Sequence, residues 1–126
     1  MSADRGPVLI VDDDADIVDF LTMMLQFEGI ATRSASSAEE AERVLREPGA
    51  AALVLCDITM PDRDGLDFCR ALRAAPHTRE TPVFILSGRV ENEIEALARA
   101  AGANQFFRKP FDHGELVARI RDELGK

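Results

Sequence analysis

Short apolar runs alternate with amphipathic stretches along the whole chain, and this alternation is compatible with few folds. The apolar runs lie at positions 8–11, 53–56 and 83–86 and at Phe106 and Phe107, with a weaker strand signal over 30–34. Short runs that are apolar throughout are typical of strands buried on both faces of a parallel sheet. Strand and helix signals follow one another as βα repeated five times. This order predicts an α/β fold with helices on both faces of a parallel sheet and right-handed crossovers.

The stretches between the apolar runs carry helical spacing and helix-end residues. Ser37 followed by Glu40 predicts a capping box that opens a helix through Leu45, and Asp112 with Glu115 predicts a cap for the last helix. The apolar residues expected to face the core from the other helical positions are Ile17, Phe20, Leu21, Met24 and Leu25, then Leu66, Cys69 and Leu72, then Ile94, Leu97 and Ala101, and finally Leu116, Ile120 and Leu124.

Length and charge exclude several classes of protein. A chain of 126 residues has the size of one domain, so we expect residues 1–126 to form a single domain. The net charge of −8 repels phosphate backbones, so we expect no direct nucleic-acid binding. No apolar run approaches the length of a membrane span, and residues 1–7 lack the layout of an export signal. We therefore expect a cytoplasmic protein without membrane contact.

The two cysteines do not indicate metal binding or a disulfide. Cys56 and Cys69 have no CxxC partner, and both lie in stretches that we expect to be buried. In a cytoplasmic protein such residues are typically reduced thiols that pack in the core.

Polar residues follow each of the four clear strand signals. The first run ends in Asp12, Asp13 and Asp14, the third strand ends in Asp57, the fourth in Ser87, and the fifth near Lys109. In an open parallel sheet, ligands bind at the carboxyl ends of the strands. The fold is thus expected to collect several carboxylates, one hydroxyl and one ammonium at the same edge.

The chemistry of this set points to phosphoryl transfer. Carboxylates crowded together repel one another, and a hard cation such as Mg²⁺, which prefers carboxylate, carbonyl and water oxygens, relieves that repulsion. Lys109 adds a compact positive charge suited to an anion, and the hydroxyl of Ser87 is able to donate one hydrogen bond to a phosphoryl oxygen. The site is suited to the transfer of a phosphoryl group to a carboxylate.

Four motifs together resemble the receiver domain of two-component response regulators. They are VLIVDDD at the first strand, LVLCDITMPDRDG around Asp57, FILSGR at the fourth strand and FFRKPF at the fifth, and they span essentially the whole chain in the family's order. The resemblance implies a flavodoxin-like, doubly wound (βα)5 sheet with strand order 2-1-3-4-5. It also implies a phosphoryl donor, either a sensor histidine kinase or a phosphotransfer protein, and an output protein regulated by a phosphorylation switch.

The resemblance is compatible with a stand-alone receiver of the chemotaxis type and with a receiver domain taken from a larger regulator, and the sequence leaves both alternatives open. We expect a monomer or a weak phosphorylation-dependent dimer. We do not expect an enzyme with a separate substrate, because such a domain catalyses only its own phosphorylation and slow self-dephosphorylation.

The family's motifs assign roles at the acidic end of the site. Asp57 is the expected phosphoacceptor, and the acidic pair Asp12 and Asp13 is expected to bind Mg²⁺ together with Asp57. The backbone carbonyl of Thr59 is the further metal ligand that the family implies, and its side chain either tunes water access or is an ordinary loop residue. Asp14 is expected to be solvated or to cap the following helix.

The other motif residues form the expected switch. Ser87 is the switch hydroxyl, and Lys109 precedes Pro110 across a peptide bond that is cis in the family. Phe106 matches the position whose ring turns inward on activation, although a plain core phenylalanine fits nearly as well. Arg89 is expected either to shield the site or to reach solvent, and the second alternative is favoured. The resemblance thus implies a change at the face formed by the fourth helix, the fifth strand and the fifth helix.

The remaining distinctive side chains are interpreted as structural. Phe20, Phe84, Phe107 and Phe111 are expected in the core, the pair Met23 and Met24 in helix packing, and His77 and His113 at the surface. Ile17 is assigned two alternatives, either core packing or, together with Pro110, docking of a kinase or phosphotransfer helix bundle beside Asp57.

Three rival functions fit the sequence less well. An FMN-binding flavodoxin needs a glycine- and hydroxyl-rich loop after the first strand, where this chain has three aspartates that would repel the phosphate. A Mg²⁺-dependent hydrolase with an aspartyl nucleophile usually has a second acid two residues later, where this chain has Thr59. A degenerate receiver would lack part of the set that Asp57, Ser87 and Lys109 complete.

Overall fold

Five parallel strands form one sheet in the order β2-β1-β3-β4-β5. The computed structural model describes residues 6–125, so the expectations for residues 1–5 and the last residue, including part of the export-signal and domain predictions, lie outside the described residues. The strands are β1 (Val8–Val11), β2 (Thr32–Ala35), β3 (Leu53–Asp57), β4 (Val83–Ser87) and β5 (Gln105–Arg108). The expected flavodoxin-like sheet with strand order 2-1-3-4-5 is confirmed.

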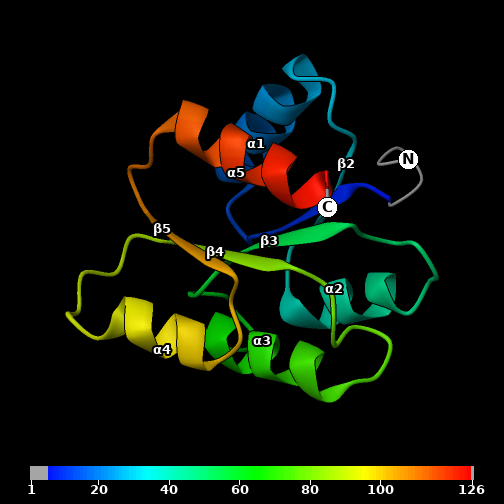
Figure 1. Ribbon diagram of the computed structural model, residues 1–126. Helices are drawn as coiled ribbons and strands as arrows, with labels where there is room; N and C mark the ends of the chain where they lie inside the picture. Colours follow the sequence, from blue (N-terminus) through cyan, green and yellow to red (C-terminus); the bar gives the residue numbers. More distant parts are fainter. Residues whose placement is uncertain (1–5, 126) are drawn as a thin grey trace.

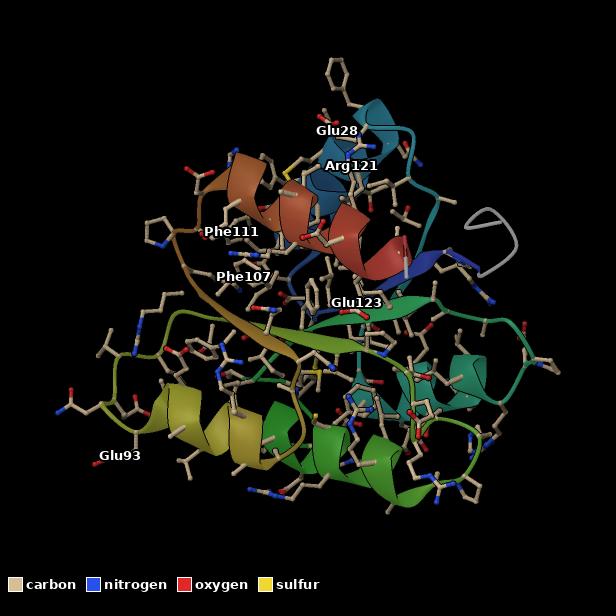
Figure 2. The ribbon with its side chains drawn as sticks, in the orientation of Figure 1. Glu28, Glu93, Phe107, Phe111, Arg121 and Glu123 are labelled. Atoms are coloured by element: carbon tan, nitrogen blue, oxygen red, sulfur yellow. The ribbon has the colours of Figure 1, made fainter. Side chains whose placement is uncertain are left out.

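Helices cover both faces of the sheet, as the alternation predicted. They are α1 (Ala15–Phe27), α2 (Ala38–Leu45), α3 (Gly65–Ala74), α4 (Ile94–Ala100) and α5 (His113–Leu124). Helices α1 and α5 lie together on one face, and α2, α3 and α4 lie on the other (Figure 1). The ends of the first pair are joined by Arg121, whose Nη2 donates to the carboxylate of Glu28 at 2.6 Å (Figure 2).

The central strands are apolar throughout because each of their faces is covered by a separate core. On β1, Leu9 and Val11 pack towards α2, α3 and α4, whereas Val8 and Ile10 pack towards α1 and α5. Successive side chains of a strand point to opposite faces of the sheet, so every side chain of a strand between two cores is buried and apolar.

Both cysteines are buried free thiols, in agreement with the sequence interpretation. Cys56 on β3 and Cys69 on α3 belong to the same core, the one beneath α2, α3 and α4. Burial raises the pKa of both thiols, so the neutral form is favoured.

The expected helix caps are present, with one correction. The side chains of Asp14, Ser37 and Asp112 each accept backbone N–H bonds at the starts of α1, α2 and α5. The carboxylate of Glu40, however, does not complete the capping box by returning to Ser37. It instead accepts from the N–H and the hydroxyl of Ser36, one residue earlier. The box is therefore formed in one half only.

Several expected core positions are wrong because helical spacing does not determine how far a helix is rotated towards the sheet. Helix α1 is seated through Leu21 and Leu25, which leaves Phe20 43 % exposed and Met23 70 % exposed. Short helix α4 is seated through Ile94 and Ala98, which leaves Leu97 47 % exposed. Phe84 and Phe107 are buried as expected, whereas Met24 and Phe111 are only half-buried at the edge of the core.

Two further expectations concern strand bounds and membranes. The weak strand signal at 30–34 was placed too early, since β2 runs from Thr32 to Ala35 with its register set by β1. None of the helices in the described part of the chain combines the length and apolar character needed to span a bilayer.

Candidate functional site

The polar strand ends meet at one edge of the sheet because all five strands are parallel. Asp57 is the last residue of β3 and Ser87 the last of β4, while Asp12 and Lys109 directly follow β1 and β5. The register keeps these ends level, with Val11 opposite Cys56, one residue before Asp57, and with Ser87 opposite Arg108, one residue before Lys109. Topology alone brings together residues that are up to about a hundred positions apart.

A three-residue charge cluster lies at the centre of this edge. The Nζ of Lys109 lies 3.5 Å from Oδ2 of Asp57 and 3.6 Å from Oδ2 of Asp12. The side chains of Asp12 and Asp57 are 5 % and 16 % exposed, so the ammonium is shared by two largely desolvated carboxylates. The peptide bond between Lys109 and Pro110 is cis, as the resemblance implied.

The electrostatic surroundings of the Asp12 carboxyl group favour a nearby cation. Burial raises its pKa, and the negative charge of Asp57 acts in the same direction. The N–H of Asp14, which donates to Oδ1 of Asp12 at 3.0 Å, and the Lys109 ammonium oppose this rise. A buried carboxylate beside a second carboxylate is stabilised by any additional positive charge.

The loop after β3 keeps the backbone close to Asp57. The N–H of Thr59 faces Oδ1 of Asp57 at 3.4 Å, and the N–H of Gly65 donates to the carbonyl of Ile58 at 2.7 Å. A Cβ at Gly65 would collide with the backbone carbonyl oxygen of Asp57, so only glycine permits α3 to begin here. Asp64 then caps α3 by accepting from Leu66.

The hydroxyl of Ser87 lies at the other side of the site and is engaged by the next loop. Ser87 is 1 % exposed, and its Oγ accepts the N–H of Arg89 at 3.0 Å. The side chain of Arg89 is exposed, so the expectation that it reaches solvent is confirmed. It also pairs with Glu91 and lies 3.9 Å from the carboxylate of Asp64, so opposite charges on two neighbouring loops orient the guanidinium.

An arginine that the sequence analysis did not single out connects the proposed switch residue Phe106 to the loop that follows Ser87. The guanidinium of Arg108 lies 5.5 Å from the ring centroid of half-buried Phe106. Its Nη1 donates to the backbone carbonyl of Arg89 at 3.2 Å. The motif FFRKPF could have indicated the contact between Arg108 and Phe106, because residues two apart on a strand share a face.

The donor set fits Mg²⁺ in its chemistry, although its members are not gathered around one point. Asp12, Asp57 and exposed Asp13 offer only oxygen donors, which suit a hard cation. The Lys109 ammonium, close to two carboxylates, already shows that positive charge is stabilised here. Among residues 6–125, however, no group of three or more His, Cys, Asp or Glu side chains is assembled to hold a metal ion.

A cavity of about 290 Å³ opens beside this edge, between α1 and the start of α2. Its lining includes the carboxylates of Asp12, Asp13, Asp19 and Glu40. A concave surface lined by one sign of charge concentrates counter-ions, so the approach to the site favours cations.

The residues proposed for docking flank the same edge. Ile17 is half-buried and packs against the core under α1 and α5, whereas Pro110 is exposed. His113 is exposed, and its ring centroid lies 4.9 Å from that of Phe20 and 5.6 Å from that of Phe111. His77 is also exposed.

Comparisons with known proteins agree with this geometry. Residues 8–121 match the family model of the response regulator receiver domain. The DNA-binding response regulator MtrA of Mycobacterium tuberculosis is 36 % identical over 124 residues, which are 98 % of this chain and 53 % of MtrA. The transcriptional regulatory protein CpxR of Escherichia coli is 37 % identical over 114 residues, 90 % of this chain and 47 % of CpxR.

A solved structure shows the same arrangement at a similar level of identity. A putative response regulator from Chloroflexus aurantiacus superposes with a TM-score of 0.88 at 31 % identity, covering 96 % of this chain and 98 % of that one. The chain spans about half the length of the curated relatives that it matches.

The doubly wound sheet, with its aspartates and lysine at the carboxyl edge, defines a phosphoacceptor signalling domain of two-component systems. The chain belongs to the response regulator receiver domain family. Members of this family generally depend on Mg²⁺ and take phosphoryl groups from kinases.

Proposed function

We propose that Asp57 accepts a phosphoryl group from a phosphohistidine on a sensor histidine kinase or phosphotransfer protein. The supporting observation is the cluster in which the Lys109 ammonium lies within 3.6 Å of both Asp57 and Asp12. A carboxylate oxygen of Asp57 attacks phosphorus, the bond from phosphorus to the imidazole nitrogen breaks, and that nitrogen keeps the electron pair. Lys109 holds Asp57 in position and then balances the charge on the phosphoryl oxygens.

The proposed metal is Mg²⁺, held by Asp12, Asp13, Asp57 and the backbone carbonyl of Thr59. The bound ion would supply charge neutralisation between the carboxylates and the incoming phosphoryl oxygens. The role of Asp12 within the protein is to keep a negative charge at a desolvated position next to Asp57. The cation-favouring electrostatics of this edge support the assignment.

The proposed switch begins at Ser87. The phosphoryl group brings about two negative charges to Asp57, and the hydroxyl of Ser87 leaves the N–H of Arg89 in order to donate to a phosphoryl oxygen. The β4–α4 loop moves with it, and the ring of Phe106 turns inward into the vacated space. The face formed by α4, β5 and α5 then changes for an output protein, as a shift between two packings.

We further propose a cytoplasmic, single receiver domain without a separate substrate, which catalyses only its own phosphorylation and slow self-dephosphorylation. It would be a monomer or a weak phosphorylation-dependent dimer. A donor helix bundle would dock at α1 and the strand-end loops, near Ile17 and Pro110, because exposed Pro110 and half-buried Ile17 flank the acceptor edge.

The acceptor is tested by treating wild type and Asp57→Asn with acetyl phosphate and Mg²⁺ and weighing the intact proteins. Wild type should gain one phosphoryl group that hydroxylamine removes, and Asp57→Asn should gain none. Asp67→Asn is the matched control, since Asp67 is an exposed carboxylate on α3 paired with Arg70. An undiminished phosphoryl group in Asp57→Asn would show that another residue is the acceptor.

A further inference from the structure

The loop after the acceptor strand is fastened to a different helix at two points. Oδ1 of Asp62 accepts the N–H of Ala38 at 3.1 Å, and Oδ2 accepts the N–H of Glu39 at 2.9 Å. The next residue, Arg63, forms a two-bonded ion pair with Glu42, at 3.0 and 2.8 Å. All three partners belong to α2, more than twenty residues earlier in the chain.

The contacts of Asp62 complete the N-terminal cap of α2. The side chain of the helix's own cap residue, Ser37, accepts the N–H of Glu40, and the two preceding N–H groups, those of Ala38 and Glu39, donate to Asp62. These N–H groups lower the pKa of Asp62, so its carboxylate remains charged at the helix end. Charge-assisted bonds of this kind are stronger than neutral ones.

The contacts of Asp62 and Arg63 with α2 restrain the short stretch of backbone that contains Thr59. At its start the stretch is held by Asp57 on β3, and its N–H group at Thr59 faces Oδ1 of Asp57. Only Thr59, Met60 and Pro61 separate the buried Ile58 from Asp62. Thr59 is exposed, so its side chain is not held by packing. The position of the Thr59 carbonyl therefore depends on the packing of half-buried Met60 against the core and on where Asp62 is anchored.

We propose that Asp62 is a positioning residue that sets the Mg²⁺ affinity of the site by holding the Thr59 carbonyl in place through α2. The inference rests on the proposed function, in which that carbonyl is a metal ligand. Residues that orient a ligand without touching the metal commonly change metal affinity by about ten- to a hundredfold. Because Asp62 acts through two intervening residues of backbone, Met60 and Pro61, we expect an effect near the lower limit.

The test is a Mg²⁺ titration of the unphosphorylated protein, followed by amide NMR because the chain has no Trp or Tyr to report by fluorescence. Asp62→Ala should bind Mg²⁺ roughly tenfold more weakly than wild type. It should also shift the Thr59 amide before any metal is added. Asp62→Asn keeps one acceptor oxygen and should fall between the two.

The matched control is Ser37→Ala, which removes a cap from the same turn of α2 but leaves the loop contacts intact. Its Mg²⁺ affinity should equal that of wild type. An equal loss of affinity in Ser37→Ala would mean that the effect comes from a weakened helix, and the proposal would be overturned. An unchanged affinity in Asp62→Ala would also overturn it. If Asp62→Ala does not fold, the comparison is made with Asp62→Asn and Ser37→Ala.

These outcomes are separable from a failure of the proposed function. If wild type itself binds no Mg²⁺, the metal assignment is wrong and the inference about Asp62 is wrong with it. If wild type binds Mg²⁺ and Asp62→Ala binds it equally well, only the positioning role is refuted.

Discussion

Replacement of Arg108 by alanine tests the proposed switch most directly. In the present arrangement the guanidinium lies 5.5 Å from the centroid of the Phe106 ring and donates to the carbonyl of Arg89 at 3.2 Å. An exposed cation–π contact contributes about 0.5–1 kcal/mol, and a typical hydrogen bond contributes about 0.5–1.5 kcal/mol, less at a solvated site. In the proposed switch, both contacts would be lost as the ring turns inward and the loop moves. Arg108→Ala should therefore favour the inward state by about 1 kcal/mol, or roughly fivefold.

The assay is beryllofluoride binding, because this phosphoryl mimic selects the activated packing. When the inward state is sparsely populated, a fivefold rise in its population gives about a fivefold gain in apparent affinity. Arg70→Ala is the control, since it removes a distant exposed arginine of α3. Repeating Arg108→Ala in a Phe106→Leu background should shrink the gain, because the ring contact is already absent. Equal affinities of wild type and Arg108→Ala would refute the reasoning, as would a full gain without the ring.

Two further predictions concern the acidic edge and the hydroxyl. Asp12→Asn should raise the melting temperature of the metal-free protein at pH 7 by a few degrees in calorimetry. Because burial raises the pKa of Asp12, its ionised form destabilises the fold at neutral pH. This destabilisation disappears as the pH falls through that raised pKa towards the ordinary value. A melting temperature that falls at neutral pH would contradict this. Ser87→Ala should still be phosphorylated, but beryllofluoride should shift its amides between 91 and 109 much less than in wild type. Equal large shifts in both proteins would show that Ser87 does not couple the site to α4.

The position of the site was predictable because it depends only on strand assignment. Once the runs that end at Asp12, Asp57, Ser87 and Lys109 are interpreted as parallel strands, their carboxyl ends must share one edge. The structure places all four residues there, with both carboxylates within 3.6 Å of the lysine ammonium. Helix caps such as Asp112 were predictable for a similar reason, since their partners lie within three residues.

Features that depend on how elements rotate and meet were not predictable. Periodicity placed Phe20 and Leu97 in the core, yet each is close to half exposed because its helix is seated through neighbouring residues. The bonds from Asp62 to α2 join a loop and a helix end that only the packed fold brings together. The contact of Arg108 with Phe106 was within reach of strand periodicity, but its bond to Arg89 depends on the path of the β4–α4 loop.

The reactivity of the two buried thiols reports on local opening of the protein. Cys56 and Cys69 lie in one core, on β3 beside the acceptor and on α3. Because burial keeps both thiols neutral and inaccessible, an alkylating reagent reaches them only during transient opening. Their labelling rates therefore measure the free energy of that opening at two places. Comparison of the two rates with and without a phosphoryl mimic would reveal whether activation loosens the acceptor strand, the adjacent helix, or both together.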